Sequence, residues 1–478
     1  MGWELIVHNI ILTVAVLAYL VWVGGTVLVV VLDNRNPVRA MAWIVVLIFL
    51  PFIGLVFYFF FGRNIRRERL ISRKAARMIS RKSLQAFIQQ DSFATPPEYD
   101  TLIRLFKSLN NALPFDGNTA DIFTDGYSML QSLMHDISQA RHHIHLEFYI
   151  FDDDAVGRLL RDLLIDKVKE GVEVRLLYDD VGCWDVPNRF YDRMRSGGIE
   201  VRGFLKVRFP LFTSKVNYRN HRKIAVIDGR IGYIGGMNIA TRYLKGGSYG
   251  VWRDTHLRIA GTAVYGLQSN FLMDWFFVES SLLTASRYYP PIQGEGDILM
   301  QTVSSEPIGE WRDIMQGLML ALNSAKRYFY IQTPYFMPNE PMLSAMQTAA
   351  LAGVDVRLML PEQSDSKLTY WGSMSYLDDV LKAGVKVYLY RPGFLHSKMM
   401  VADDMLCTIG STNMDFRSLE HNFEINTFIY NREVARLAKE LFLRDQKESR
   451  LVRMKQWDRR PFRNKAKESV VRLLSPLL

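Results

Sequence analysis

The first sixty residues form two long apolar runs separated by a short polar turn. Residues 10–32 and residues 40–61 contain no charged side chain, and residues 33–39 between them are mostly polar. Each run is long enough to cross a hydrocarbon layer of about 30 Å as a helix. No Lys or Arg precedes the first run, which disfavours a cleaved signal peptide. The pattern predicts a hairpin of two transmembrane helices within residues 1–62.

Further along, the apolar positions indicate strands that alternate with helices, and the order of these elements occurs twice. Such alternation is typical of βα units around a sheet. The expected strands of the first half lie at residues 144–151, 171–177 and 198–201, and those of the second half at 329–336, 353–360 and 384–387. Repetition at this scale indicates an internal duplication. We expect a first half over residues 111–290 and a second half over residues 291–478.

Charge changes the picture at the two flanks of this α/β body. Residues 63–82 hold nine basic residues and one acidic residue, and residues 443–478 hold eleven basic and four acidic residues. Because the whole chain carries +10, the remainder is net −5. We interpret residues 63–110 as a basic juxtamembrane linker, which keeps the body on the cytoplasmic side. This distribution suits a membrane surface and disfavours nucleic acid as a partner.

The chain ends on an apolar segment that follows the second basic stretch. Residues 470–478 contain seven apolar side chains, one serine and a single arginine. The segment could enter the membrane interface, or it could pack on the protein. The sequence leaves both alternatives open, and it does not predict the oligomeric state.

Each half contains the same polar signature. His is followed by Lys at +2, Asp at +7 and Asn at +17 in both copies. These residues are His221, Lys223, Asp228 and Asn238 in the first half, and His396, Lys398, Asp403 and Asn413 in the second. Chance rarely produces two such matches in one chain. We therefore expect one site built from both halves.

The residue types in this signature suit a phosphodiester. His and Lys two positions apart on a strand project to the same face. Lys and Asn can stabilise charge that develops on phosphate oxygens, while one His acts as a nucleophile and the other as an acid. The lysines would repel a divalent cation, so we expect neither a metal nor a cofactor. The only cysteines, Cys183 and Cys407, exclude a clustered-cysteine zinc site and a disulfide framework.

With this duplicated motif the chain resembles the phospholipase D superfamily. The apolar N-terminus and the ending at residues 472–478 are similar to bacterial cardiolipin synthases. The resemblance implies two tandem phospholipase D-like α/β/α sandwich halves, which form a pseudo-two-fold catalytic body behind a transmembrane hairpin. It also implies a multi-pass protein of the bacterial inner membrane, with phospholipid, above all phosphatidylglycerol, as substrate.

The resemblance further implies a ping-pong transfer. His221 would attack one phosphatidylglycerol, form a phosphatidyl-histidine and release glycerol. His396 would act as acid and then as base for a second phosphatidylglycerol, and the product would be cardiolipin. The assignment of the nucleophile comes from the family, since nothing in the sequence distinguishes His221 from His396.

The resemblance also implies a carboxylate that orients each histidine, and Asp254 and Glu424 are the candidates by position. The motif residues Asp228 and Asp403 fall in expected hairpin turns, where a structural role suits them better than a catalytic one. Ser411 stands where the first half has Gly236, which suggests a phosphate contact from one side only.

Three weaker features complete the interpretation. Residues 152–154, all Asp, are expected to cap a helix. His142, His143 and His145 are expected at a strand edge on the surface. Glu147 and Gln332 occupy matching strand positions and are expected to line the cleft.

Other functions remain open at this point. Water as acceptor would make the chain a phospholipase, and serine would make it a phosphatidylserine synthase. A non-catalytic membrane scaffold is the alternative from another class, although a scaffold does not need two complete sets of matched polar groups.

Overall fold

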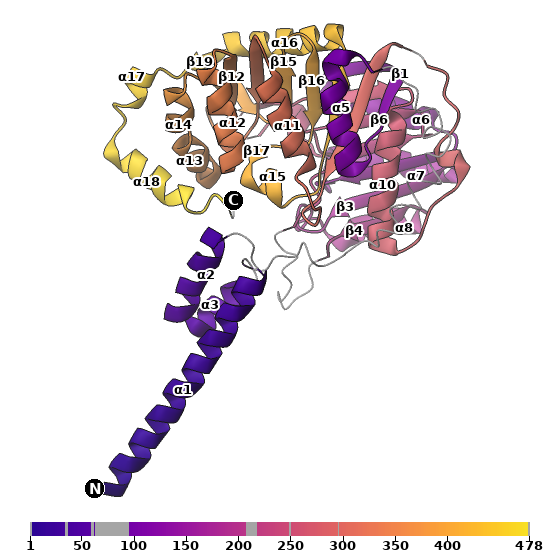
Figure 1. The fold of residues 1–478 in the computed structure, drawn as a ribbon. Coiled ribbons are helices and arrows are strands. Elements are labelled where there is room, and N and C mark those ends of the chain that lie inside the picture. The colour runs from indigo at the N-terminus through magenta and orange to yellow at the C-terminus, as the bar shows by residue number, and fades with distance from the viewer. Residues whose placement is uncertain are drawn as a thin grey trace. The chain divides into compact units, whose positions relative to one another are not determined.

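The computed structural model describes residues 2–33, 37–58, 62, 95–206, 218–247, 250–294 and 296–476, which form an N-terminal helical unit and an α/β body (Figure 1). The basic stretch at 63–82, on which the predicted orientation depends, lies outside these residues.

The N-terminal unit differs from the predicted hairpin in its second helix. Helix α1 (Gly2–Asp33) contains Ile6–Leu32, which among the described residues is the one segment long and apolar enough to cross a membrane. The second apolar run instead forms α2 (Pro37–Phe49) and α3 (Pro51–Phe57). The helix stops because Pro51 has no N–H and disfavours the helical conformation at Leu50. A second continuous span over residues 40–61 is therefore not confirmed.

The body is a mixed α/β fold around one sheet of fifteen strands, and its halves share a strand order. From the centre outward, the first half contributes β1 (Pro114–Phe123), β8 (His256–Ala260), β6 (Ile231–Gly235), β5 (Lys223–Ile227), β2 (His143–Phe148), β3 (Glu173–Asp179) and β4 (Glu200–Phe204). The second half contributes β9 (Ile298–Ser305), β18 (Glu424–Tyr430), β16 (Leu406–Gly410), β15 (Met399–Ala402), β10 (Tyr328–Gln332), β12 (Asp355–Pro361) and β13 (Lys386–Tyr390), with β19 (Ser449–Leu451) at the edge. The expected duplication is confirmed.

The two halves join in the middle of this sheet, where β1 and β9 pair antiparallel. In the first half, β2 runs parallel to β3 and antiparallel to β5. In the second half, β10 runs in the same way parallel to β12 and antiparallel to β15. The pseudo-two-fold relation thus follows from identical topology on the two sides of the β1–β9 pair.

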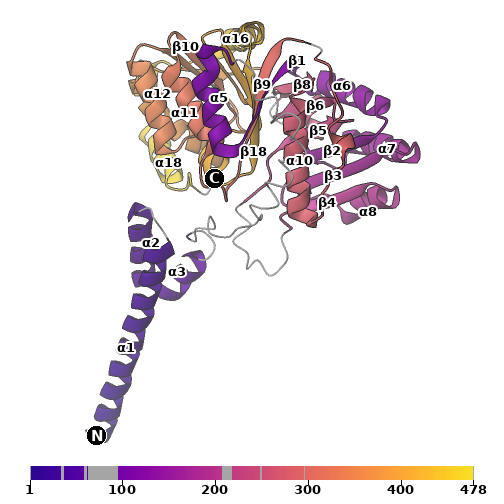
Figure 2. The same ribbon diagram turned by 45° about the vertical axis from the view of Figure 1, so that its right-hand side comes forward.

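Helices cover both faces of each half (Figure 2). Apolar residues of α6 (Gly126–Gln139), α7 (Ala155–Lys169) and α8 (Asn188–Ser196) form one core with the first-half strands. Residues of α11 (Asp313–Ser324), α12 (Glu340–Leu351), α13 (Lys367–Ser375) and α14 (Leu377–Lys382) do the same in the second half. On the opposite face, α10 (Val264–Glu279) and α16 (Arg432–Lys447) share a core between the halves.

The expected linker contains a helix that packs on the body. Helix α5 (Pro97–Asn110) buries Tyr99, Leu102, Ile103 and Phe106, whose spacing marks one helical face. These side chains belong to the core of the second half, although α5 precedes the first half in the chain. The Tyr99 hydroxyl donates to the Met405 carbonyl at 3.1 Å, so α5 ties the start of the body to its distant half.

Candidate active site

Each motif histidine directly follows a short segment that pairs in parallel with a segment of the opposite half. Asn220 forms a parallel bridge with Phe423, and β14 (Gly393–Leu395) pairs with β7 (Val251–Arg253). The backbone N–H of His221 donates to the Phe423 carbonyl at 2.9 Å, and that of His396 donates to the Arg253 carbonyl at 2.8 Å. Each histidine is thus fixed by the backbone of the opposite half.

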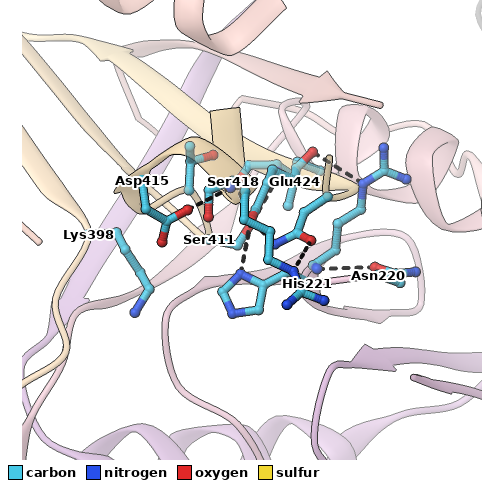
Figure 3. Close-up of polar contacts among 12 residues, drawn as sticks. Asn220, His221, Lys398, Ser411, Asp415, Ser418 and Glu424 are labelled. Atoms are coloured by element: carbon cyan, nitrogen blue, oxygen red, sulfur yellow. Dashed lines mark hydrogen bonds and ion pairs between the residues drawn. The ribbon is translucent and has the colours of Figure 1, made fainter. Parts of the chain in front are cut away.

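The side chains of the two histidines also contact the opposite half. Nδ1 of His221 lies 3.1 Å from both carboxylate oxygens of Glu424, which belongs to the second half (Figure 3). Nδ1 of His396 lies 2.6 Å from Oδ2 of Asp254, which belongs to the first half. A carboxylate on Nδ1 holds the proton there and leaves Nε2 free to react. Both predicted orienting residues therefore contact a histidine, each that of the other half.

Burial controls the protonation of the two histidines. Burial is the main cause that lowers the pKa of His221 to about 4, against the opposing pull of Glu424. The pKa of His396 is lowered by burial and by the charge of Lys398. The pKa values of Glu424 and Asp254 are lowered despite burial, because cationic groups of the site favour their ionised forms. Each pair at neutral pH is a neutral imidazole on a carboxylate.

The two lysines add positive charge to the same volume. Lys223 and Lys398 each donate to the backbone carbonyl of their own motif histidine, and Figure 3 shows Lys398 on the same side as the His221 ring. Burial is the main cause that lowers the pKa of Lys223 to about 7 and that of Lys398 to about 8. The charge of Lys398 also lowers the pKa of Lys223 and of His396, and the charge of Lys223 lowers that of His221. An anionic phosphodiester would relieve this crowding of positive charge.

The chain's similarity to known proteins agrees with this geometry. The family model described as cardiolipin synthase, PLD-like domain, matches residues 133–257 and 318–446, and the N-terminal model of the phospholipase D-nuclease type matches residues 20–63. The major cardiolipin synthase ClsA of Bacillus subtilis is 38% identical over 95% of this chain and 96% of its own. A cardiolipin synthase of Geobacillus kaustophilus is 40% identical over 94% of this chain and 91% of its own. This chain belongs to the cardiolipin synthase family.

A solved structure shares the fold. The crystal structure of a phosphatidylserine synthase from Haemophilus influenzae aligns with a TM-score of 0.59 and 16% identity, over 79% of this chain and all of that one. At this identity the likeness concerns the fold of the body alone.

In this member of the cardiolipin synthase family, the two orienting carboxylates are supported differently. The Ser411 hydroxyl donates to Glu424, and Asn422 Nδ2 donates to the same carboxylate at 3.2 Å. At the equivalent position of the first half a Cβ on Gly236 would lie 2.1 Å from Oδ1 of Asp254. The difference between Gly236 and Ser411 thus reflects how each carboxylate is held, and the Ser411 hydroxyl is engaged within the protein.

The two predicted asparagines also differ in their contacts. Asn238 accepts from the Ile150 N–H at 3.0 Å and donates to the Tyr243 hydroxyl at 2.8 Å. It therefore fixes Tyr243, whose ring centroid lies 6.1 Å from that of His396. In contrast, Oδ1 of Asn413 is buried without a hydrogen-bond partner among the described residues. Asn238 is therefore engaged within the protein through both ends of its amide, whereas the Asn413 carbonyl oxygen is not.

The motif aspartates, which the duplicated signature placed beside the candidate catalytic residues, lie in turns away from the lysines, where a structural role was expected for them. Asp228 and Asp403 follow β5 and β15, so about five extended residues, or roughly 16 Å, separate each from its lysine. Asp228 accepts backbone N–H bonds from residues 141–143, and Asp403 accepts them from residues 326–328. Both have positive φ. Their role in the fold is to tie a tight turn to the start of a neighbouring strand.

Replacing Asp403 with alanine is therefore expected to destabilise the fold and to spare the chemistry. Losing three charge-assisted bonds should lower the free energy of unfolding by about 2–4 kcal/mol. Activity for each folded molecule should stay within a few-fold of the wild type. Thermal unfolding and an activity assay normalised to folded protein would measure both, with His396→Ala as the opposite case. A folded but inactive Asp403→Ala chain would restore a catalytic role.

Sequence reasoning missed a set of buried polar contacts in each half, made by residues that flank a motif histidine or bond to its backbone. Asn220, which precedes His221, donates to Glu147, and Arg222 contacts Asp274 of α10. In the second half Gln332 donates to Asp445 of α16 at 2.9 Å, and Asp445 contacts Arg253. The signal was the matching strand positions of Glu147 and Gln332. Both are buried and engaged within the protein, so neither lines an open cleft as expected.

At this position the first half has the carboxyl group of Glu147 and the second half has the amide of Gln332. Oε2 of Glu147 is buried without a partner, and burial together with the charge of Asp274 raises the pKa of Glu147 well above its usual range. A protonated Glu147 can donate to Asp274, as the Gln332 amide does to Asp445. Glutamine is therefore the neutral counterpart of the state in which Glu147 is held.

The substitution Glu147→Gln is expected to keep or raise stability. Since the folded chain retains a proton that the unfolded chain releases above pH about 4.5, wild-type stability falls as pH rises from there, and the variant loses this dependence. Urea unfolding of both proteins at pH 5 and pH 8 would measure it, with Asp274→Asn, which breaks the Arg222 pair, as the destabilising control. A loss of more than about 1 kcal/mol in Glu147→Gln would contradict the shared proton.

Two further expectations have clear outcomes. Asp154 caps α7 by accepting from the N–H groups of Val156 and Gly157, as predicted for this acidic run. The histidines at 143 and 145 are fully buried against Gln268 and Phe271, so their assignment to a surface edge was wrong. The reason is that α10 covers the face of β2 that the sequence suggested was open.

Among the described residues no group of three or more His, Cys, Asp or Glu could hold a metal ion.

Proposed function

We propose that this chain is a cardiolipin synthase that transfers the phosphatidyl group of one phosphatidylglycerol to a second one, with release of glycerol. The observation that carries the proposal is the pair of histidines, each held by a carboxylate of the opposite half and contacted by the motif lysine of its own half. Relatives about 40% identical over nearly the whole chain are named cardiolipin synthases. A scaffold would not require two aligned, carboxylate-bound imidazoles.

In the first step Nε2 of His221 attacks the phosphorus of the donor lipid. A phosphorus–nitrogen bond forms, the bond to the glycerol oxygen breaks, and that oxygen takes a proton from Nε2 of His396. Glu424 stabilises the positive charge that develops on the His221 ring. His396 is neutral in the free site, and the anionic phosphodiester favours its protonation by placing negative charge beside it.

In the second step the terminal hydroxyl of another phosphatidylglycerol attacks the phosphatidyl-histidine. Nε2 of His396 accepts the hydroxyl proton, the phosphorus–nitrogen bond breaks, and the His221 ring is neutral again. Lys223, Lys398 and Asn413 are the donors for the non-bridging oxygens in both steps. No step requires a metal, because the two ammonium groups supply the positive charge.

We assign the protein to the bacterial cell membrane, with the body on the cytoplasmic side. Helix α1 supplies one span, and the basic stretch at residues 63–82 supports this orientation. Helices α2 and α3 then form the return segment of a hairpin that the proline break at Leu50 and Pro51 bends. Glycosylation-site or cysteine-accessibility mapping of residues 33–39 in cells would test whether this turn reaches the outer face.

The function is tested by the products of the full chain in vesicles. Phosphatidylglycerol labelled in its headgroup and its acyl chains is supplied with EDTA, and lipids and water-soluble products are separated. Cardiolipin with one glycerol per turnover is expected from wild type and from neither His221→Ala nor His396→Ala. Phosphatidic acid as the main product would mean that water is the acceptor. Phosphatidylserine formed on addition of serine would indicate the other synthase, and no turnover under any condition would leave the scaffold.

Lysine protonation should set the alkaline limit of the reaction. Because kcat/KM reports groups of the free enzyme, it is expected to fall as pH rises through about 7 to 8, where Lys223 and Lys398 lose their protons. Protonation of His221 limits it only near pH 4. A pH profile between 5 and 10 would measure this, with Lys223→Arg expected to move the alkaline limb upward to about 8, where Lys398 loses its proton. A flat profile to pH 10 would contradict the role of the lysines.

A further inference from the structure

Helix α18 (Phe462–Arg472), near the end of the chain, turns an apolar stripe away from the protein. Phe462, Ala466, Val470 and Leu473 recur at the spacing of one helical face. Phe462 and Leu473 are 82% and 81% exposed, and Leu474 beside them is also exposed. A surface helix of a soluble protein places such a stripe against its core, so this one is unpartnered among the described residues.

The opposite face of α18 packs on the protein. Val471 and Glu468 are buried, Glu468 accepts from Arg460, and the Lys467 ammonium lies 5.3 Å from the centre of the Trp371 ring. Arg472 bonds the Ser375 carbonyl at the end of α13. The outward stripe is therefore not a sign of a loosely attached helix, because a separate set of contacts fixes its orientation.

The attachment places α18 at the active-site end of the second half. A Cβ on Gly372 of α13 would lie 2.4 Å from the Met337 sulfur and 3.7 Å from Val471, so both residues pack close to Gly372. Met337 pairs with Asp415, which Figure 3 shows near Lys398. The other end of the sheet holds Leu351, at the end of α12 before β12.

The basic residues around the apolar stripe indicate what kind of surface it contacts. Eight basic and two acidic residues lie between positions 453 and 472. An outward apolar stripe on a strongly basic helix is the pattern of segments that lie in the interface of an anionic bilayer. A protein partner would have to present an acidic, apolar groove, whereas the proposed substrate is itself an anionic lipid.

We propose that the outward face of α18 lies in the interface of an anionic lipid bilayer and holds the active-site end of the second half against the membrane that contains the substrate. The inference depends on the proposed function only for the choice of lipid as partner. Val470 and Leu473 would then enter the interface while Val471 packs on the protein, so each of the two alternatives left open by the sequence applies to one face of this segment.

Single labelled cysteines in the full chain test this placement. The native Cys183 and Cys407 are both buried, so a fluorophore such as NBD would react with an introduced cysteine. Leu473→Cys and Val470→Cys report on α18, and Leu351→Cys is the matched control, an equally apolar residue that is 73% exposed. The proteins are placed in phosphatidylglycerol–phosphatidylcholine vesicles that carry a quencher on the acyl chains.

The α18 labels are expected to emit at shorter wavelength and to be quenched by the acyl chains, while the Leu351 label remains in water. Equal signals from all three sites would overturn the proposal. A shift without quenching by lipid would indicate a contact with protein and would overturn it as well. This readout does not depend on turnover, so it stands even if no cardiolipin is formed.

A second measurement links the surface to substrate use. Leu473→Ser should lower kcat/KM on vesicles by about tenfold, because one leucine side chain leaves the apolar phase. Its thermal unfolding and its turnover of detergent-dispersed lipid should match wild type, and Leu351→Ser should change neither. An unchanged kcat/KM on vesicles would contradict the proposal.

Discussion

His221→Ala is expected to lower kcat by about 10⁴-fold or more, the largest effect of any single substitution in this chain, since a nucleophile has no substitute within the site. His396→Ala should be almost as severe with phosphatidylglycerol, because glycerol is a poor leaving group without a proton. Turnover alone therefore does not separate the two roles. A donor whose leaving group needs no proton does.

Phosphatidyl-p-nitrophenol is such a donor. With it, His396→Ala should release one equivalent of nitrophenolate in a burst and retain the lipid on His221, since the second step lacks its base. His221→Ala should give no burst. Mass spectrometry of the peptide that contains residue 221, worked up at alkaline pH to preserve the phosphoramidate, would locate the lipid. A burst in His221→Ala and none in His396→Ala would exchange the two roles.

Asp254→Asn and Glu424→Gln are each expected to lower kcat by about 10³ to 10⁴, because an amide can present the wrong group to Nδ1 and stabilise the wrong tautomer. The crossed geometry determines how they differ. Asp254 contacts His396, so Asp254→Asn should retain the nitrophenolate burst. Glu424 contacts His221, so Glu424→Gln should lose it.

Double substitutions test which histidine each carboxylate supports. Asp254→Asn should add little to the loss in His396→Ala, and it should keep its full effect in Asp403→Ala, a variant that shares no contact with it. Glu424→Gln should behave in the same way toward His221→Ala. A retained burst in Glu424→Gln, or its loss in Asp254→Asn, would show that each carboxylate serves the histidine of its own half.

The motif spacing was enough to predict the duplicated fold and the residues that gather at its centre. It was not enough to predict that each carboxylate contacts the histidine of the opposite half. Asp254 follows His221 of its own half by 33 positions, and Glu424 follows His396 by 28. Proximity in sequence favours the wrong pairing, and the topology of the short parallel bridges decides the right one. These bridges involve only one to three residues on each side, which leaves no periodic pattern to recognise.

Two other differences have equally local causes. A count of apolar residues over 40–61 indicated a span, but one proline ends the helix after Phe49. Alternation near His143 and His145 suggested an exposed face, but both faces of the sheet are covered, so polar residues there are buried and bonded. In each case the pattern described the segment correctly and its surroundings decided the structure.

The crossed carboxylates also bear on how such a chain could arise. A single half holds a histidine and a carboxylate that do not meet, so it is incomplete alone. Two identical copies joined along their β1-type strands would complete each other and contain two equivalent centres. Once fused, the copies could diverge, and the present contrasts between Asp254 and Glu424, Gly236 and Ser411, and Glu147 and Gln332 are differences that a symmetric ancestor could not have carried. Gene fusion would thus be the event that allowed one imidazole to specialise for attack and its twin for proton transfer.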